Sequence, residues 1–298
     1  KAEDVLEVLP DVLYVARGAG VEEVKDFHIF SFPGDVEYDP FGDDFEPMDL
    51  SSILEFVSVL VQEIKTHQSQ KVLYVLDKGH RQVANGIFLL GCYLMLTKLK
   101  AVKPDLIRKA LGGWTTALCS PERKKWSDTS DFSLSISDCW NGVWRATTLQ
   151  WVRQLPVDGP QWGEINVPLF EHYRNPLNGD LVQVVPGKMI AFREPVDLGS
   201  CQYTDVEGER WFSPSYYTDV LCHLGVDTVV ALSRVSYDSR VFERRGMRCV
   251  QLQMRDPDSP TRGVVEAFLR LAAQAGTVAV HCEVRPGQGG RGFILLHR

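Results

Sequence analysis

The feature that most constrains this chain is a pattern that occurs twice: an amphipathic helix, a short apolar strand and then a loop. Apolar residues recur at spacings of three and four over residues 53–64, and the apolar run 72–76 follows. Near the C-terminus the same spacing over residues 264–272 precedes the apolar run 277–280. Short apolar strands that alternate with helices are typical of an α/β fold, which we therefore predict.

The repeated pattern also indicates an internal duplication. In the first copy, Ser51 or Ser52 is the expected N-cap of the helix, because a serine side chain accepts a hydrogen bond from a backbone amide of the first turn. Asp77 stands after the first strand about where Cys282 stands after the second. The first half of the chain therefore lacks a cysteine at this position.

A stretch rich in proline, glycine and asparagine divides the sequence at residues 156–187. Such a composition favours a connecting segment over a regular element. A chain of 298 residues is long enough for two domains, each with its own core. We predict a first domain over residues 1–155, an interdomain linker over 156–187 and a second domain over 188–298.

Charge and hydropathy exclude two kinds of partner. The net charge is −7, whereas a protein that binds nucleic acid presents a positive face to the phosphate backbone, so we expect no nucleic-acid partner. The longest apolar run, 83–96, is shorter than the roughly 18 residues of a membrane-spanning helix. We interpret it as a buried helix and expect no membrane partner. No charged-then-apolar leader follows Lys1, and we expect no signal peptide.

The seven cysteines are scattered, and none forms a Cys-x-x-Cys pair. This arrangement fits neither a cysteine zinc site nor a disulfide framework, and it favours a reducing compartment. One of them, Cys282, follows the second apolar strand and His281 directly. Position alone favours an inert core thiol for Cys282 over a nucleophile.

Two aspartates, Asp256 and Asp258, lie on a polar loop before the second amphipathic helix. Position alone favours helix capping for them. A cysteine that cleaves a phosphate ester needs such an acid on a separate loop, to protonate the leaving oxygen. It also needs a loop of inward-facing backbone N–H groups, a helix N-terminus behind the loop and an arginine that clamps the phosphoryl group.

Several segments, taken together and in order, resemble the cysteine-dependent dual-specificity protein phosphatases of the cell-division-cycle-fourteen, mitotic-exit type. Segments similar to the first domain of that family are 41–50 and 81–91. Those similar to its linker and second domain are 171–173, 178–180, 185–192, 213–217, 226–232, 242–246, 256–260 and 278–282. The collinear order from about Leu6 to Cys282 makes the resemblance specific, although no single segment would.

The resemblance implies two tandem α/β domains of phosphatase-like fold, of which only the second is catalytic. It implies that Cys282 is the nucleophile that forms a phosphocysteine. Asp256 would be the general acid and then the base for the attacking water. Glu171 and Asp180 would line the substrate groove. The phosphate-binding loop would consist of Glu283, Val284, Arg285, Gly287 and Gln288.

The resemblance also implies the partners and the location. The expected substrates are phosphoserine and phosphotyrosine proteins, with phosphoserine before proline favoured, and no metal or organic cofactor is implied. A role in the cell cycle and in mitosis is expected, in the nucleus and cytoplasm and at the centrosome and spindle. The oligomeric state does not follow from the resemblance.

The sequence departs from the family pattern after the nucleophile. The family's loop reads His-Cys, five residues and then Arg, whereas Gln288 holds the arginine position and cannot form a guanidinium fork. Pro286 removes one backbone donor from the loop. Arg285 and Arg291 lie nearby at other spacings.

The family continues with a long helix behind this loop and with further helices, whereas the sequence ends at Arg298. We therefore expect a second domain that is incomplete at its C-terminus. The abrupt change after Cys282 suggests a reading-frame slip, an alternative exon or an artefact of gene prediction. Two functions stay open: a phosphatase, favoured by Cys282 and Asp256, and a phosphatase-like binding module without turnover, favoured by Gln288.

Overall fold

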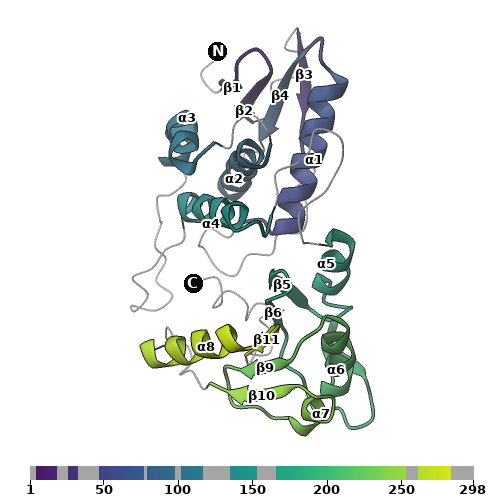
Figure 1. Ribbon diagram of the computed structural model, residues 1–298. Coiled ribbons are helices and arrows are strands. Elements are labelled where there is room, and N and C mark those ends of the chain that lie inside the picture. The colour runs from purple at the N-terminus through teal and green to yellow at the C-terminus, as the bar shows by residue number, and fades with distance from the viewer. Residues whose placement is uncertain are drawn as a thin grey trace. The chain divides into compact units, whose positions relative to one another are not determined.

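The computed structural model describes residues 5–18, 26–32, 47–76, 79–97, 102–116, 135–152, 166–252 and 261–282 (Figure 1). The chain divides into two compact units, Lys1–Gly163 and Glu164–Arg298. Each unit combines a mixed β-sheet with α-helices, which confirms the predicted α/β fold class. The division falls inside the segment 156–187 that was predicted as a linker.

The first unit contains a four-stranded sheet in the order β1-β2-β4-β3. The outer strand β1 (Val5–Leu9) runs antiparallel to β2 (Leu13–Arg17). The inner strand β4 (Lys71–Leu76) runs parallel both to β2 and to β3 (Phe27–Phe30). The apolar run 72–76 is thus an inner strand, as its composition predicts.

Four described helices belong to the first unit: α1 (Leu50–Thr66), α2 (His80–Leu96), α3 (Pro104–Thr116) and α4 (Ile136–Thr148). The other three pack against α2, which carries the apolar run 83–96 and is buried along most of its length. This confirms the predicted buried helix. None of the described helices combines the length and apolar composition needed to cross a bilayer.

The N-cap predicted for α1 is wrong. Ser51 and Ser52 are both buried inside the first turn. Asp49 precedes the helix in extended conformation, and its carboxylate accepts a hydrogen bond from the Ser52 amide at 2.9 Å. An aspartate and a serine cap a helix equally well, so composition alone did not distinguish the two positions.

The second unit contains a five-stranded sheet in the order β10-β9-β11-β6-β5. Its centre is β11 (Val278–His281), which runs parallel to β6 (Met189–Phe192) and to β9 (Thr228–Ala231). At the edges, β10 (Arg248–Gln251) is parallel to β9, and β5 (Leu181–Val185) is antiparallel to β6. A separate hairpin is formed by β7 (Tyr203–Val206) and β8 (Glu209–Phe212).

Successive residues of the central strands point to opposite faces of this sheet, and the core is divided accordingly. On one face Ala279 packs with the side chains of α6 (Pro214–His223) and α7 (Arg240–Glu243). On the other face Val278 and Val280 pack with Leu271 of α8 (Arg262–Gln274). Figure 1 shows α8 on the opposite side of the sheet from α6.

The described part of the predicted linker contains a helix and a strand. Residues 166–187 include α5 (Val167–Arg174) and β5, which pack together within the second unit. Asn166 caps α5, since its side-chain oxygen accepts a hydrogen bond from the Leu169 amide at 3.1 Å. The exact extents of the domains and the linker stay a prediction.

Candidate functional site

The predicted nucleophile Cys282 directly follows β11, the central strand of the second sheet. All four residues of β11 are buried, and Cys282 itself is partly buried. Because β6, β9, β10 and β11 are parallel, their carboxyl ends lie at one edge of the sheet, where open α/β sheets bind their ligands. Cys282 therefore lies at the edge of the sheet where the parallel strands end.

The strand pairing extends to the residue before the cysteine. His281 pairs with Ala231 of β9, and its carbonyl oxygen accepts a hydrogen bond from the Leu232 amide at 2.9 Å. Cys282 also packs against the smaller apolar cluster, which includes Val280 and Leu232. The backbone that carries the sulfur is thereby fixed by the sheet up to the last residue of β11.

The side chain of His281 is buried beneath the strand end. Its Nε2 is hydrogen-bonded to the Tyr237 hydroxyl at 2.7 Å, and the Phe192 ring contacts it edge to face at 5.1 Å. Burial lowers the pKa of His281 to about 3, so the imidazole is uncharged near neutral pH. Burial also raises the pKa of Tyr237, and its hydroxyl keeps its proton.

An uncharged imidazole has a chemical consequence for the neighbouring cysteine. A histidinium beside a thiol favours the thiolate, whereas a neutral histidine supplies no such charge. Any stabilisation of a Cys282 thiolate must therefore come from backbone N–H groups, from a helix end or from another cation. The His281 side chain is held at the end of β11 by the Tyr237 hydroxyl and the Phe192 ring.

Six of the predicted site residues lie outside the described residues. These are the general acid Asp256 and the five loop residues Glu283, Val284, Arg285, Gly287 and Gln288. Their roles stay predictions. Around Cys282, the described residues bring no three potential metal ligands together.

The two predicted groove residues lie in different environments. Glu171 is exposed on α5, whereas the side chain of Asp180, just before β5, is only 7% exposed. Asp180 has a left-handed backbone with φ of 47°, and its carbonyl oxygen accepts a hydrogen bond from the Arg193 amide at 3.1 Å. A role for either residue in a substrate groove stays a prediction.

Asp180 belongs to a buried group of charges that the sequence did not reveal. Burial raises its pKa to about 6, while the positive charge of Arg193 acts in the opposite direction. The Arg193 guanidinium donates to Glu209 at 2.7 Å and lies 4.1 Å from the ring centre of Trp211. Arg193 follows β6 directly, so it extends from the same sheet edge as Cys282. An unexpected charge directly after an apolar strand was the only sequence signal for Arg193.

Comparisons with known proteins add family information to this geometry. A family model described as the N-terminal half of dual specificity protein phosphatases matches residues 7–146. The chain is 26% identical over 272 residues to the dual specificity protein phosphatase CDC14C of Symphalangus syndactylus, which covers 90% of this chain and 53% of that protein. It is 27% identical over 305 residues to the tyrosine-protein phosphatase CDC14 homolog of Schizosaccharomyces pombe, with 96% and 53% covered.

Human CDC14A, also named a dual specificity protein phosphatase, is 26% identical over 288 residues, with 95% of this chain and 46% of that protein covered. The chain spans about half the length of the curated relatives it matches. Among solved structures, a putative protein tyrosine phosphatase from Leishmania major aligns with a TM-score of 0.26 and 24% identity, over 36% of this chain and 63% of that chain.

Proposed function

Because the chain is a homologue of the CDC14-family dual-specificity protein phosphatases, we propose that it hydrolyses phosphoserine and phosphotyrosine esters on proteins. The observation that carries the proposal is the position of Cys282. It follows the buried central strand of a parallel sheet, at the edge where the strands end. Position alone is also compatible with an inert core thiol, and the homology to the CDC14 phosphatases favours the nucleophile.

The reaction would proceed in two displacements at phosphorus. The Cys282 thiolate attacks the phosphorus atom, the bond to the serine or tyrosine oxygen breaks, and Asp256 gives its proton to that oxygen. Water then attacks the phosphocysteine, Asp256 takes a proton from the water, and the phosphorus–sulfur bond breaks. Inorganic phosphate leaves, and both side chains return to their starting states.

The loop after Cys282 would hold the phosphoryl oxygens. Backbone N–H groups of residues 283–288 would donate to them, except that of Pro286, which has no amide hydrogen. Because His281 is uncharged, these donors would also carry the stabilisation of the thiolate. Serine before proline would be the favoured substrate sequence, with Glu171 and Asp180 in the groove. The nucleus, cytoplasm, centrosome and spindle are the proposed locations, by homology.

A second candidate function rests on Gln288. A glutamine at the arginine position of the loop has no positive charge and no guanidinium fork for the phosphoryl group. Loss of one donor to a transition state costs about 2.7–4 kcal/mol, a factor of roughly 10²–10³ in rate. The chain would then hold phosphoproteins with little or no turnover.

A phosphatase assay on this chain separates the two functions. The substrates are p-nitrophenyl phosphate and matched peptides with phosphoserine before proline, phosphoserine before alanine, or phosphotyrosine. We expect Cys282→Ser to abolish phosphate release. The control Cys222→Ser, which changes an exposed cysteine on α6, should leave the rate unchanged. Hydrolysis that survives Cys282→Ser would overturn the proposed mechanism.

The variant Gln288→Arg tests the alternative. If the missing arginine limits the rate, Gln288→Arg should raise kcat by roughly 10²–10³. Should wild type bind the phosphopeptides but release no phosphate, this chain acts as a binding module. Phosphate release by Gln288→Arg would then show that the missing arginine is the cause, and an inactive Gln288→Arg would show that Gln288 is not. Equal rates on the proline and alanine peptides would remove the Ser-Pro preference alone.

A further inference from the structure

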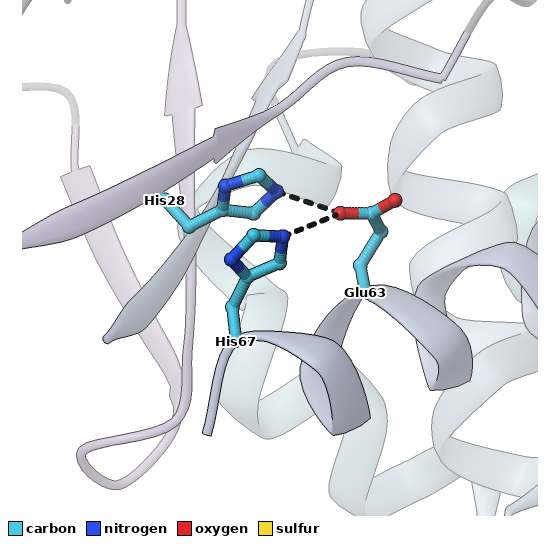
Figure 2. A group of neighbouring side chains, drawn as sticks. All are labelled: His28, Glu63 and His67. Carbon is cyan, nitrogen blue, oxygen red and sulfur yellow. Dashed lines mark hydrogen bonds and ion pairs between the residues drawn. The ribbon is translucent and has the colours of Figure 1, made fainter. Parts of the chain in front are cut away.

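A group of three potential metal ligands lies in the first unit, on elements that carry none of the proposed phosphatase residues. Figure 2 shows His28 of β3 beside Glu63 and His67, at the C-terminal end of α1. Nε2 of His28 lies 2.6 Å from Oε2 of Glu63, and Nε2 of His67 lies 3.8 Å from the same oxygen. Both imidazoles therefore face one carboxylate oxygen.

Local structure explains how these residues meet. Glu63 and His67 are four residues apart, which places them on one face of α1 and at its end. His28 and Phe30 share one face of β3, since side chains two apart in a strand point the same way. The ring of Phe30 lies 6.4 Å from that of Phe56 on α1, so this face is directed at the helix. His28 therefore reaches the last turn of α1.

The two imidazoles are stacked, with ring centres 3.4 Å apart and planes 9° from parallel. The hydrogen bond with Glu63 accounts for the placement of His28. The second imidazole, of His67, has only a long contact with the same Glu63 oxygen. Two protonated rings at this distance would repel each other. A single cation bound by all three side chains would satisfy both ring nitrogens and the carboxylate together.

The donor set and the distances indicate the class of cation. Two imidazole nitrogens and one carboxylate oxygen are typical ligands of zinc, whereas calcium and magnesium prefer oxygen ligands throughout. Bonds of about 2.0–2.1 Å around a tetrahedral zinc ion place ligand atoms roughly 3.3 Å apart. The observed 2.6 and 3.8 Å lie on either side of this separation, and one ligand atom from each residue lies within 4.8 Å of the others.

We propose that His28, Glu63 and His67 bind one zinc ion, or a similar divalent transition metal, that connects β3 to the end of α1. Their side chains are 24%, 29% and 30% exposed, so the ion can enter from solvent and water can occupy the fourth position. Binding requires the two rings to swing apart and the hydrogen bond between His28 and Glu63 to open. Among the described strands, β3 is an edge strand that pairs with β4 only, and the ion would replace the single hydrogen bond between His28 and Glu63 by a three-ligand connection to α1.

The test is a zinc titration of the full chain in competition with a chromophoric chelator, repeated with cobalt, whose absorption reports the coordination geometry. We expect wild type to bind one equivalent of zinc. Glu63→Gln, which preserves side-chain size, should lower the zinc affinity about tenfold or more. His67→Gln should show the same loss. The matched controls are Glu55→Gln, an exposed glutamate on the same helix, and His223→Gln on α6, which should bind as wild type does.

Three results would overturn the proposal. One is the absence of stoichiometric zinc binding to wild type. Another is equal zinc affinity in wild type, Glu63→Gln and the double variant His28→Gln with His67→Gln, which would assign the binding to the cysteines. The third is a cobalt spectrum with thiolate charge-transfer bands and no change in Glu63→Gln. Because Glu63→Gln retains a hydrogen-bonding group of the same size, its melting temperature without metal serves as the check on folding.

A second readout tests the attachment of β3. Zinc should raise the melting temperature of wild type and slow hydrogen exchange in the peptide that contains β3, and neither effect should occur in Glu63→Gln. Neither readout depends on phosphate release. An inactive chain that binds zinc leaves this proposal intact, and an active chain that does not bind zinc refutes it.

Discussion

The two units repeat one strand plan and differ at the end of the inner parallel strand. In the first, the order β1-β2-β4-β3 has an antiparallel outer pair followed by two parallel pairs. In the second, β5-β6-β11-β9 has the same sequence of pairings, and β10 is added beyond β9. The shared order supports the internal duplication that the sequence pattern indicated.

The residues that follow the two corresponding strands carry the difference. β4 ends at Leu76 and is followed in sequence by Asp77, whereas β11 ends at His281 and is followed by Cys282. A carboxylate repels a phosphate ester, while a thiolate attacks its phosphorus atom. If the chain is a phosphatase as proposed, the scaffold would therefore carry the nucleophile in its second copy only, because function depends on the site and not on the fold.

The helices before these strands also differ. Seven residues of α1 are buried, among them Phe56 and Leu60, and α2 packs beside α1. In α8 only Leu271 is buried, while Val265 and Leu269 are 38% and 59% exposed. The counterpart of α2 would follow Cys282 in sequence, beyond the described residues. In the described part of the chain, α1 is therefore the better packed of the two helices.

The largest expected effect tests whether catalysis belongs to the second unit alone. Asp256→Asn should lower kcat on a phosphopeptide by about 10²–10⁴, because an amide cannot protonate the leaving oxygen. The loss should be smaller for p-nitrophenyl phosphate, whose leaving group needs less protonation. Asp77→Asn in the first unit should leave both rates unchanged, as measured by steady-state kinetics. A comparable loss in Asp77→Asn would show that the first unit contributes to the chemistry.

The next effect is the loss of folding stability in acid, which should be larger in the second unit than in the first. The unfolded chain binds a proton at His281 near the ordinary pKa of 6.5, but the folded chain does so only near 3. This contribution to stability is complete above pH 6.5 and is lost as the pH falls from 6.5 to 3, by roughly 3–5 kcal/mol. Asp180, with a pKa raised to about 6, opposes part of the loss below pH 6. Hydrogen exchange at pH 7.5 and 5.0 should show protection lost first in the second unit.

Two variants test whether His281 causes this loss of stability in acid. In His281→Asn the fall in stability below pH 6.5 should be reduced, even if the variant is less stable at pH 7.5. In Tyr237→Phe the hydrogen bond is lost, at a cost of about 1 kcal/mol, but the buried imidazole and its pH dependence persist. If stability falls below pH 6.5 in His281→Asn as much as in wild type, another group causes the fall.

The sequence predicted those parts of the fold that depend on local periodicity. The apolar runs 72–76 and 277–280 became β4 and β11, and the run 83–96 became α2, because continuous burial requires continuous apolar side chains. The resemblance to the CDC14 family is confirmed by the relatives and the family model. Position alone favoured an inert thiol at Cys282, since a buried thiol can also follow a strand, and only the family resemblance implied a nucleophile there.

Contacts between segments far apart in the chain could not be predicted from the sequence. Thirty-five residues separate His28 from Glu63, and their meeting depends on which face β3 turns towards α1. The burial of Asp180 depends on its left-handed backbone and on Arg193 after another strand. The predicted linker contained α5 because proline and asparagine begin helices as well as turns, and it also contained the strand β5. Neither the contact of His28 with Glu63 nor the burial of Asp180 leaves a local pattern.

A smaller effect on stability tests how tightly α2 is packed in the first unit. A Cβ atom added at Gly91 of α2 would lie 2.3 Å from the indole of Trp140. That indole is fully buried and donates to the Phe88 carbonyl at 2.9 Å, so it cannot move aside freely. Gly91→Ala should therefore destabilise the chain by about 1–3 kcal/mol despite the better helix propensity of alanine. Urea unfolding measures the change, and hydrogen exchange locates it in the first unit.

The smallest effect has the opposite sign and lies in the second unit. Gly263 occupies the first turn of α8, and a Cβ atom added there meets no atom within 4 Å. Gly263→Ala should raise the free energy of unfolding by about 0.4–1 kcal/mol, because alanine restricts the unfolded chain and adds no clash. Opposite signs at Gly91 and Gly263 would confirm that α2 is tightly packed and that the start of α8 is open. A destabilising Gly263→Ala would mean that other residues of the chain cover this part of α8.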